Sequence, residues 1–379
     1  MLKNKIYNYL TKEIAKTFII ILFAFTTIAW TVRAVNFLDL MIEDGYTISI
    51  YLQYSLFNLS TILTRFIPLA FLIALIVGIL KFERQQELLI LWTIGLSKIK
   101  IANLFFSIAL IVTVVQIILA FFINPSVLYK SRILLKESTS KQISSVIKSN
   151  DFSDSFKNVT FYVDNKNDEG EMTNIFIRDN TNALSTIIAE TEGNNNTTII
   201  AKKGIIIDRK LILFEGLIQT ENKTGEIKNI DFEKTELALD GFATRTITQP
   251  KMQETSSLSL IECLTKNKLN ENIRNCPYTE NKKEVIETLA RRIGMPLYIP
   301  LVAIIASFLL IHKKEKKINF LKKYIFFIIA FMILIFAEIM VRFSGQSPTN
   351  SLIYFLFPFA LMPILYLMLL KTIMSERKI

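Results

Sequence analysis

Six long apolar runs constrain the fold of this chain more than any other feature. A helix needs about 20 residues to cross roughly 30 Å of hydrocarbon, because each residue adds about 1.5 Å. The third run is the clearest, since no charged residue interrupts the sequence between Lys100 and Lys130. The first continues into Trp30 and Arg33 with no small-residue cleavage site, so we expect an uncleaved anchor rather than a signal peptide. We therefore predict an α-helical integral membrane protein with six spanning helices, at residues 14–36, 51–80, 101–123, 293–311, 324–341 and 351–370.

The basic residues predict how these helices are oriented. The net charge is +11, but residues 125–290 hold 22 Lys and Arg against 24 Asp and Glu, which leaves 22 basic and 9 acidic residues for the membrane part. An excess confined to the membrane part argues against a nucleic-acid partner. If the helices alternate, 17 of those 22 basic residues fall on one side, which the positive-inside rule makes the cytoplasm. Both termini are then expected inside and residues 125–290 outside.

An all-β domain is predicted between the third and fourth helices. From about residue 159 apolar and polar residues alternate, as expected for strands with one solvated face. Stretches rich in Asn, Asp and Gly separate these segments, and strands at this spacing are typical of a sandwich, jelly roll or barrel. The alternating segments are residues 158–165, 173–180, 185–192, 197–208, 210–221 and 227–240.

A helical, charged pattern returns after the strands and predicts a connector helix at the outer surface of the membrane. Cys263 and Cys276 lie in the same outer region, where a disulfide could persist, although two cysteines alone do not decide whether they pair. The expected organisation is residues 1–124 with three spanning helices and a cytoplasmic helix at 82–96, residues 125–253 as the β domain, 254–292 as the connector and 293–379 as three more spanning helices.

The connection between the second and third helices is short and carries a helical pattern: KFERQQELLILWTIGLSKIKIANL. Read as one helix from Phe82 to Leu96, it presents an apolar face that has nothing to pack on within its own loop. The face could dip into the lipid interface, but interfacial helices carry Lys or Arg on their polar side, and this one carries two Glu, two Gln and one Arg. The other interpretation is that a partner protein holds it. The candidate contact residues are Glu83, Arg84, Glu87, Leu88, Leu91, Trp92, Gly95 and Leu96.

Several motifs, taken in order along the chain, resemble one known family. The pattern E-x-x-x-E-L-x-x-L-x-x-x-G-L-S-K runs from Glu83 to Lys98. YLTKEI precedes the first helix, IPLAFLIALIVGI lies in the second, and ARRIGMPLYIPL opens the fourth. Together they resemble the lipopolysaccharide export permeases LptF and LptG over essentially the full length. GLSK and the later FEGLIQ look more like LptF than LptG.

The resemblance implies a function, a location and a set of partners. It implies one permease of an ABC-type lipopolysaccharide exporter in the bacterial inner membrane, paired with an LptG-like permease and an LptB-like ATPase dimer. The all-β domain would be a periplasmic jelly roll that passes lipopolysaccharide to LptC- and LptA-like bridge proteins. Residues 83–96 would be the coupling helix seated in the ATPase, with Glu87 at the family's acidic position. Two other interpretations stay open: a permease for another lipid, and a non-transporting anchor for the β domain.

The sequence contains none of the catalytic motifs that we searched for. G-x-x-x-x-G-K-[ST], H-E-x-x-H and G-x-S-x-G do not occur, and no His, Cys and carboxylate cluster has metal-ligand spacing. We therefore expect a non-catalytic permease with no cofactor or metal of its own. ATP and Mg would be bound by the partner ATPase.

In the membrane part, the basic residues that are not on the predicted cytoplasmic side are all arginines. A guanidinium fork binds phosphate through two hydrogen bonds, which suits a phosphorylated glycolipid at an interface. The competing interpretation is that each arginine snorkels to the headgroups or makes a structural ion pair. Glu338, four residues before Arg342, is expected to pair with it. The candidate substrate ligands are Arg33, Arg65, Arg291, Arg292 and Arg342, with Arg33 and Arg65 the strongest.

Overall fold

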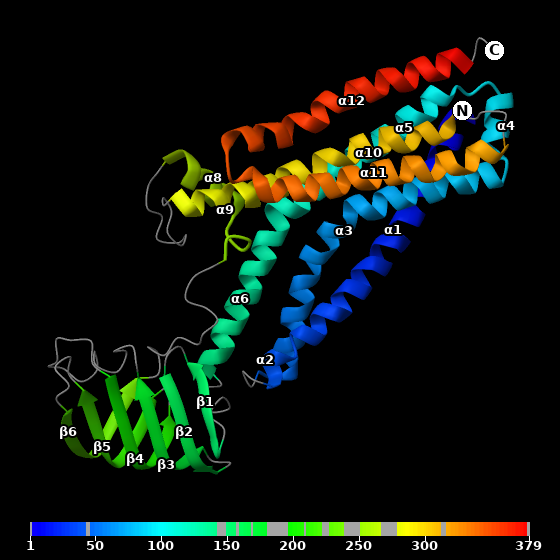
Figure 1. Cartoon of the computed structure of the whole chain (residues 1–379). Coiled ribbons are helices and arrows are strands. Elements are labelled where there is room, and N and C mark those ends of the chain that lie inside the picture. Colours follow the sequence, from blue (N-terminus) through cyan, green and yellow to red (C-terminus); the bar gives the residue numbers. More distant parts are fainter. Residues whose placement is uncertain are drawn as a thin grey trace. The chain divides into compact units, whose positions relative to one another are not determined.

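Figure 1 shows the computed structural model, in which a group of long helices and one β-sheet form two compact units. The helical unit comprises Met1–Val32, Phe57–Tyr129 and Pro250–Ile379. The β unit comprises Arg33–Leu56 and Lys130–Gln249. The structure describes residues 2–42, 46–141, 149–156, 159–167, 170–179, 196–207, 210–221, 227–238, 251–266, 279–311 and 316–376.

Among the described residues, six helical segments are long and apolar enough to span a membrane, which confirms the predicted number. The second and fourth are mostly buried, whereas the other four leave most of their apolar side chains exposed. Apolar surface on this scale suits hydrocarbon and not water. The six segments are Lys5–Ile42, Ile48–Arg84, Lys98–Leu135, Lys282–Leu310, Tyr324–Ser344 and Pro348–Glu376. They are built from α1 (Leu2–Asn36), α2 (Asp39–Ile42), α3 (Ile48–Arg84), α5 (Lys98–Ile118), η1 (Leu119–Ile123), α6 (Asn124–Lys141), α9 (Thr279–Leu289), η3 (Ala290–Gly294), η4 (Met295–Leu297), α10 (Tyr298–Ser307), η5 (Phe308–Leu310), α11 (Lys316–Ser344) and α12 (Pro348–Glu376).

The core of the helical unit surrounds α10. Every residue of this helix is buried, and it packs against α5, α11 and α12. A helix that is apolar all round must be enclosed on every side. Ala303 and Ala306 are fully buried, and small side chains of this kind allow neighbouring helices to approach closely.

Two of the spanning helices contain a π-helical turn and continue beyond the predicted ends. α5 passes through η1 into α6, and α9 passes through η3 and η4 into α10. The expected domain boundaries at residues 124 and 292 therefore fall inside continuous helices. Each π turn ends two residues before a proline, Pro125 or Pro296. A proline ring displaces the carbonyl four residues earlier, and a locally widened helix is one way to accommodate it.

The described strands form one antiparallel sheet in the order β1-β2-β3-β4-β5-β6. Five of the predicted strands are confirmed, and residues 185–192, predicted as another, lie outside the described residues. The strand at Asp151–Phe156 was not predicted, because DFSDSF has a single apolar residue type at irregular spacing. One face holds buried side chains such as Phe161, Ile177 and Leu213. The strands are β1 (Asp151–Phe156), β2 (Val159–Lys166), β3 (Glu171–Asp179), β4 (Asn196–Ile207), β5 (Lys210–Glu221) and β6 (Ile227–Ala238).

The predicted connector contains two helices, α8 (Ser257–Lys266) and α9. They pack through a small apolar cluster that includes Leu260, Cys263 and Val285. Cys263 is buried and is not a free thiol, while Cys276 lies outside the described residues.

Candidate functional site

The coupling segment, residues 82–98, is not the single helix that the sequence predicted. α3 ends at Arg84, and a separate short helix, α4 (Glu87–Thr93), follows. Gln86 between them has a left-handed backbone with φ 57°, which costs a non-glycine residue about 1–2 kcal/mol. The break turns α4 back toward the other helices, so that two leucines gain about 1.5–3 kcal/mol each by burial. Leucine burial therefore outweighs the cost of the break.

The predicted apolar face of this segment lies inside the protein. Leu88, Leu91 and Leu96 belong to the core of the helical unit, and Trp92 is partly buried against it. This corrects the expectation that the face has no packing partner of its own. A second set of apolar residues is exposed instead: Leu89 is 60%, Ile90 54% and Ile94 65% exposed. The sequence ELLILWTIG has apolar residues all round, so its period could not show which face is outward.

Polar contacts tie the coupling segment to the first and last helices. Tyr9 on α1 donates a hydrogen bond to Glu87, at 3.0 Å between Oη and Oε1. Lys98 donates to Glu376 on α12 at 2.6 Å, and its Nζ lies 5.7 Å from the centre of the Trp92 ring. Directly before the segment, Lys81 makes an ion pair with Glu13 on α1. Of the remaining predicted contacts, Arg84 is exposed and Glu83 and Gly95 flank α4. A displacement of α4 would thus act on α1, α3, α5 and α12.

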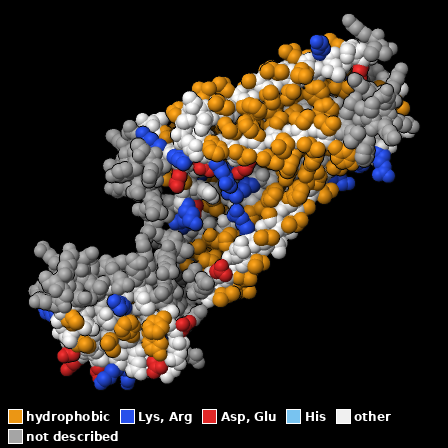
Figure 2. Space-filling model, in the orientation of Figure 1, with side chains coloured by type: hydrophobic (Ala, Val, Ile, Leu, Met, Phe, Trp, Pro, Cys, Tyr) orange, Lys and Arg blue, Asp and Glu red, His pale blue; other side chains and the backbone are white. Residues whose placement is uncertain are grey.

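A cavity of about 340 Å³ lies within the helical unit, far along α3 from the coupling segment. It is enclosed by α3, α5, η1, α6, α9, η3, η4 and α11. Figure 2 shows that the exposed surface of the helices is mostly apolar and is interrupted by a group of basic and acidic side chains. The lining residues are Thr61, Thr64, Arg65, Leu69, Gln116, Ala120, Asn124, Leu128, Gln253, Thr288, Arg291, Arg292, Met295, Phe331, Leu334, Ile335 and Glu338.

Arg292 reaches this cavity but has a structural role. Its side chain is 6% exposed, and the guanidinium donates to the backbone carbonyls of Gln253 at 2.9 Å and Thr255 at 3.0 Å. It also donates to Ser257 Oγ at 2.6 Å, and Ser257 in turn donates to the carbonyl of Phe121 at 2.7 Å. Phe121 is the residue four before Pro125, so this hydrogen bond satisfies the carbonyl that the proline displaces. Arg292 is therefore wrong as a predicted phosphate ligand, because backbone oxygens already occupy its fork.

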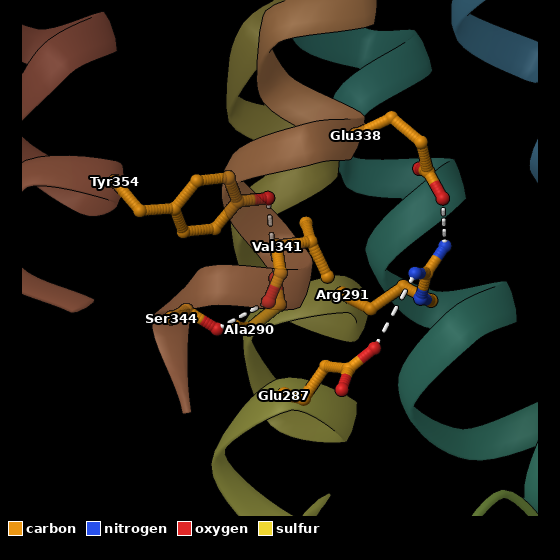
Figure 3. Close-up of polar contacts among 7 residues, drawn as sticks. All are labelled: Glu287, Ala290, Arg291, Glu338, Val341, Ser344 and Tyr354. Carbon is orange, nitrogen blue, oxygen red and sulfur yellow. Dashed lines mark hydrogen bonds and ion pairs between the residues drawn. The ribbon is translucent and has the colours of Figure 1, made fainter. Parts of the chain in front are cut away.

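Arg291 lines the same cavity as its neighbour and makes ion pairs. It contacts Glu338 on α11 and lies 3.7 Å from Glu287 one turn earlier, as Figure 3 shows. The expected pair between Glu338 and Arg342 is thus wrong: Glu338 turns to the cavity, whereas Arg342 is exposed at the end of α11. A charge inside a membrane protein is stabilised chiefly by a close counter-charge, and the neighbouring helix provides it.

The structure brings three of the five predicted arginines together and leaves two apart. Arg65, Arg291 and Arg292 all line the cavity. Arg342 is not among the lining residues, and Arg33 ends α1 and belongs to the other compact unit.

Uncharged polar residues of the cavity wall were missed by the sequence analysis. Asn124 accepts from Ser60 at 2.5 Å and donates to Thr64 Oγ1 at 2.6 Å. Gln116 donates to the carbonyl of Thr64 at 3.2 Å, while its buried Oε1 has no partner among the described residues. Amides within predicted spans are the signal that would have found them, because a buried polar side chain in a membrane needs a partner.

Gly294 explains part of the motif that opens the fourth helix. A Cβ at this position would lie 2.1 Å from the Tyr354 ring, far inside van der Waals contact. The Tyr354 hydroxyl donates to the carbonyl of Ala290 at 3.4 Å, and its own carbonyl accepts from Tyr298 at 2.9 Å (Figure 3 draws the first contact). The glycine therefore allows α12 to lie against the π turn beside the cavity.

Comparison with known proteins decides the family. The sequence profile described as "Lipopolysaccharide export system permease LptF/LptG" matches residues 8–372. The chain belongs to the LptF/LptG family. The profile covers both names, so the preference for LptF stays a prediction. An uncharacterized protein of Rickettsia prowazekii (strain Madrid E), RP871, is 27% identical over 247 residues, which is 63% of this chain and 64% of the relative.

Membership of the LptF/LptG family fits the architecture. Six apolar helices with a sheet domain between the third and fourth fit a multi-pass inner-membrane permease, and the sheet domain fits a jelly roll. The description of the profile names a permease of a lipopolysaccharide export system.

Proposed function

We propose that this chain is one permease of an ATP-driven exporter that extracts lipopolysaccharide from the outer leaflet of the inner membrane. The family match over residues 8–372 is the observation that carries the proposal. The chain would pair with an LptG-like permease, and an LptB-like ATPase dimer would bind ATP and Mg. Each methylene moved out of hydrocarbon costs about 0.8 kcal/mol, so a lipid with many acyl chains does not leave the membrane unaided. Extraction of such a lipid from the membrane therefore requires an external source of energy.

The ATPase would bind the exposed apolar residues of α4. Leu89, Ile90 and Ile94 are more than half exposed, beside the family's acidic position at Glu87. The ties from Glu87 to Tyr9 and from Lys98 to Glu376 support transmission of the movement to α1 and α12. The buried apolar residues of this segment would contribute to coupling indirectly, by holding α4 on the helical unit. They are Leu88, Leu91, Trp92 and Leu96.

Substrate contacts are proposed for four of the predicted arginines. Arg65 and Arg291 line the cavity, and Arg33 stays a candidate in the outer half of the first span. Arg342 is exposed and stays a weaker candidate. Arg292 is left out of this proposal, because its guanidinium donates to backbone carbonyls.

Transfer to the periplasmic bridge would use an edge of the sheet. β1 and β6 are the edge strands of the described sheet, and an unpaired edge offers backbone donors and acceptors to a strand of another protein. In this proposal β1 or β6 joins an LptC-like protein by β-augmentation, with the β unit on the periplasmic side.

Reconstitution tests the proposal against its two alternatives. The chain is co-purified with its ATPase and permease partners, placed in proteoliposomes with lipopolysaccharide, and supplied with ATP and the bridge protein. We expect ATP-dependent crosslinking of lipopolysaccharide to the bridge. Transfer of a different lipid would indicate another substrate, and failure of any ATPase to co-purify would indicate an anchor.

A further inference from the structure

The last helix, α12, contacts the coupling segment at one end and the π turn η3 near the other. Glu376 is its last residue, and Tyr354 lies near its start. The two residues are 22 positions apart, which is about 33 Å along a helix. Between them α12 packs against α10, α11 and the beginning of α5. α12 is therefore long enough to carry a movement from the coupling segment to η3.

The contact at the coupling segment is an ion pair with little exposure to solvent. Lys98 Nζ lies 2.6 Å from Glu376 Oε2, and the two side chains are 20% and 22% exposed. Lys98 is the last residue of the coupling segment and the first of α5, and its Nζ lies 5.7 Å from the centre of the Trp92 ring on α4. A partly buried ion pair is screened less than an exposed one. A displacement of α4 therefore acts directly on the end of α12.

The contact near the start of α12 is a buried pair of tyrosines. Tyr354 and Tyr298 have no exposed surface, and their rings stack with centroids 5.6 Å apart. The Tyr298 hydroxyl donates to the carbonyl of Tyr354 at 2.9 Å. The Tyr354 ring also lies so close to Gly294 that a Cβ there would be 2.1 Å from it. This packing leaves the ring little room to slide over the fourth span.

The same tyrosine reaches the turn that carries a cavity residue. Tyr354 Oη donates to the carbonyl of Ala290 at 3.4 Å, and the next residue, Arg291, lines the cavity and pairs with Glu338 (Figure 3). Ala290 and Arg291 both belong to η3, and π turns are frequent at functional sites. A shift of Tyr354 would therefore move the peptide that carries Arg291.

The middle of α12 contains two prolines, which are the places where the helix can bend. On the coupling side of Pro363, Tyr366 donates to Asn103 on α5 at 3.0 Å. Together with the pair at Lys98, this hydrogen bond ties that part of α12 to the beginning of α5. On the other side, Pro358 is buried, and α12 is tied to η3 and α10. Both halves are thus held by neighbours, and a bend can occur only between them.

We propose that α12 is a transmission element of the permease, joined to the coupling segment by the Lys98–Glu376 ion pair and to η3 by Tyr354. Movement of α4 then shifts the turn that carries Arg291, while α3 carries the same movement to Arg65. Lys98, Glu376 and Tyr354 are positioning residues, because they act through η3 and not on ATP or the lipid. The inference rests on the proposed function, since it requires an ATPase bound at α4.

Hydrogen–deuterium exchange of the complete exporter tests the proposal. The chain with its ATPase and permease partners is trapped with ATP and vanadate, and exchange is followed in residues 87–93 of α4 and residues 290–294 of η3. In the unaltered complex we expect both regions to respond to trapping. Glu376→Gln should abolish the response at η3 and preserve it at α4. Lipid transferred per ATP hydrolysed should then fall by about fivefold or more, within the usual range of coupling between sites.

Two control variants separate transmission from general damage. Lys98→Arg keeps a cation beside Glu376 and Trp92, so it should keep the response at η3. Glu13→Gln breaks the matched ion pair with Lys81, which also borders the coupling segment but leads to α1, and it too should keep that response. Loss of the η3 response in either control would overturn the proposal, and so would its survival in Glu376→Gln.

Failure of this inference is distinguishable from failure of the proposed function. A response at α4 without one at η3 in the unaltered complex would overturn the role of α12 and leave the ATPase contact in place. No response at α4 in the unaltered complex would overturn the ATPase contact and the role of α12 with it.

Discussion

Gly294 is a residue at which the helical unit tolerates little change. A methyl group there would meet Tyr354 ring atoms at 2.1 and 2.8 Å, so the ring or the π turn must move. Overpacking of this kind costs about 1–3 kcal/mol. We therefore expect Gly294→Ala to lower the apparent Tm of the purified chain in detergent by several degrees.

Gly78 provides the matched control for this prediction. It also lies within a spanning helix, but a Cβ there would meet Ile14 at an ordinary 3.4 Å. Gly78→Ala should leave the Tm unchanged or raise it slightly, because alanine favours helix over glycine by about 1 kcal/mol. Similar Tm values for the two variants would refute the close approach of α12.

Residue roles divide into those that the sequence predicts and those that it does not. The arginine excess at one depth is visible in the sequence, and two of the predicted arginines, Arg65 and Arg291, line the cavity. Their contact with substrate stays a prediction. The partners of Arg292 lie 35 to 40 residues away, and the partner of Glu338 lies 47 residues away. The i, i+4 pairing rule therefore predicted Arg342 as the partner of Glu338, whereas the folded protein pairs Glu338 with Arg291 on another helix.

α4 is the element whose surface can be tested most directly. Ile90→Asp places a charge on an exposed apolar surface and leaves the core intact, so we expect loss of ATPase co-purification by tenfold or more with an unchanged Tm. Ile90→Val keeps the apolar surface and should keep the ATPase bound. ATPase co-purification is measured by pull-down from detergent-solubilised membranes, and the Tm is measured by a thermal scan.

Leu91→Asp separates the outward surface of α4 from the inward one. Leu91 is 8% exposed, so a carboxylate there would be buried without a partner and should lower the Tm. ATPase retention by Ile90→Asp would show that the exposed residues are not the contact. A stable Leu91→Asp protein would show that the segment does not pack as the structure describes.

Elements with a strong, regular period were predictable, and those shaped by breaks were not. The spanning helices and β2 through β6 follow the hydropathy pattern of neighbouring residues, which can be read directly from the sequence. The separation of α4 from α3 depends on Gln86 adopting φ 57°, which no residue preference at glutamine predicts. The π turn η1 likewise depends on Pro125, and the carbonyl that this proline displaces, that of Phe121, accepts a hydrogen bond from Ser257 on a distant helix.

At the scale of the whole molecule, α3 joins the cavity to the coupling segment. Arg65 and Arg84 are 19 residues apart, about 28 Å along a helix, so one continuous helix spans from the cavity to the coupling segment. Pro68 lies inside this helix near the cavity, where proline kinks permit bending. We therefore expect force applied at α4 to reach the cavity through α3, with any bend at Pro68.

The number of spans predicts the side of each region. If all six helices cross the membrane, both termini lie on one side and a sheet inserted after the third crossing lies on the other. The positive-inside rule predicts that the first side is the cytoplasm. Exposed lysines on each side allow a test, since Lys12 lies on α1 and Lys234 on β6.

Labelling of spheroplasts with a membrane-impermeant maleimide measures this arrangement. Lys234→Cys should react in intact spheroplasts, whereas Lys12→Cys should react only after permeabilisation, and the unaltered chain sets the background labelling. Reaction of Lys12→Cys in intact spheroplasts would invert the orientation and place α4 away from any cytoplasmic ATPase. Reaction of both Lys12→Cys and Lys234→Cys without permeabilisation would instead require an even number of crossings between the two positions, whereas the first three spans separate them.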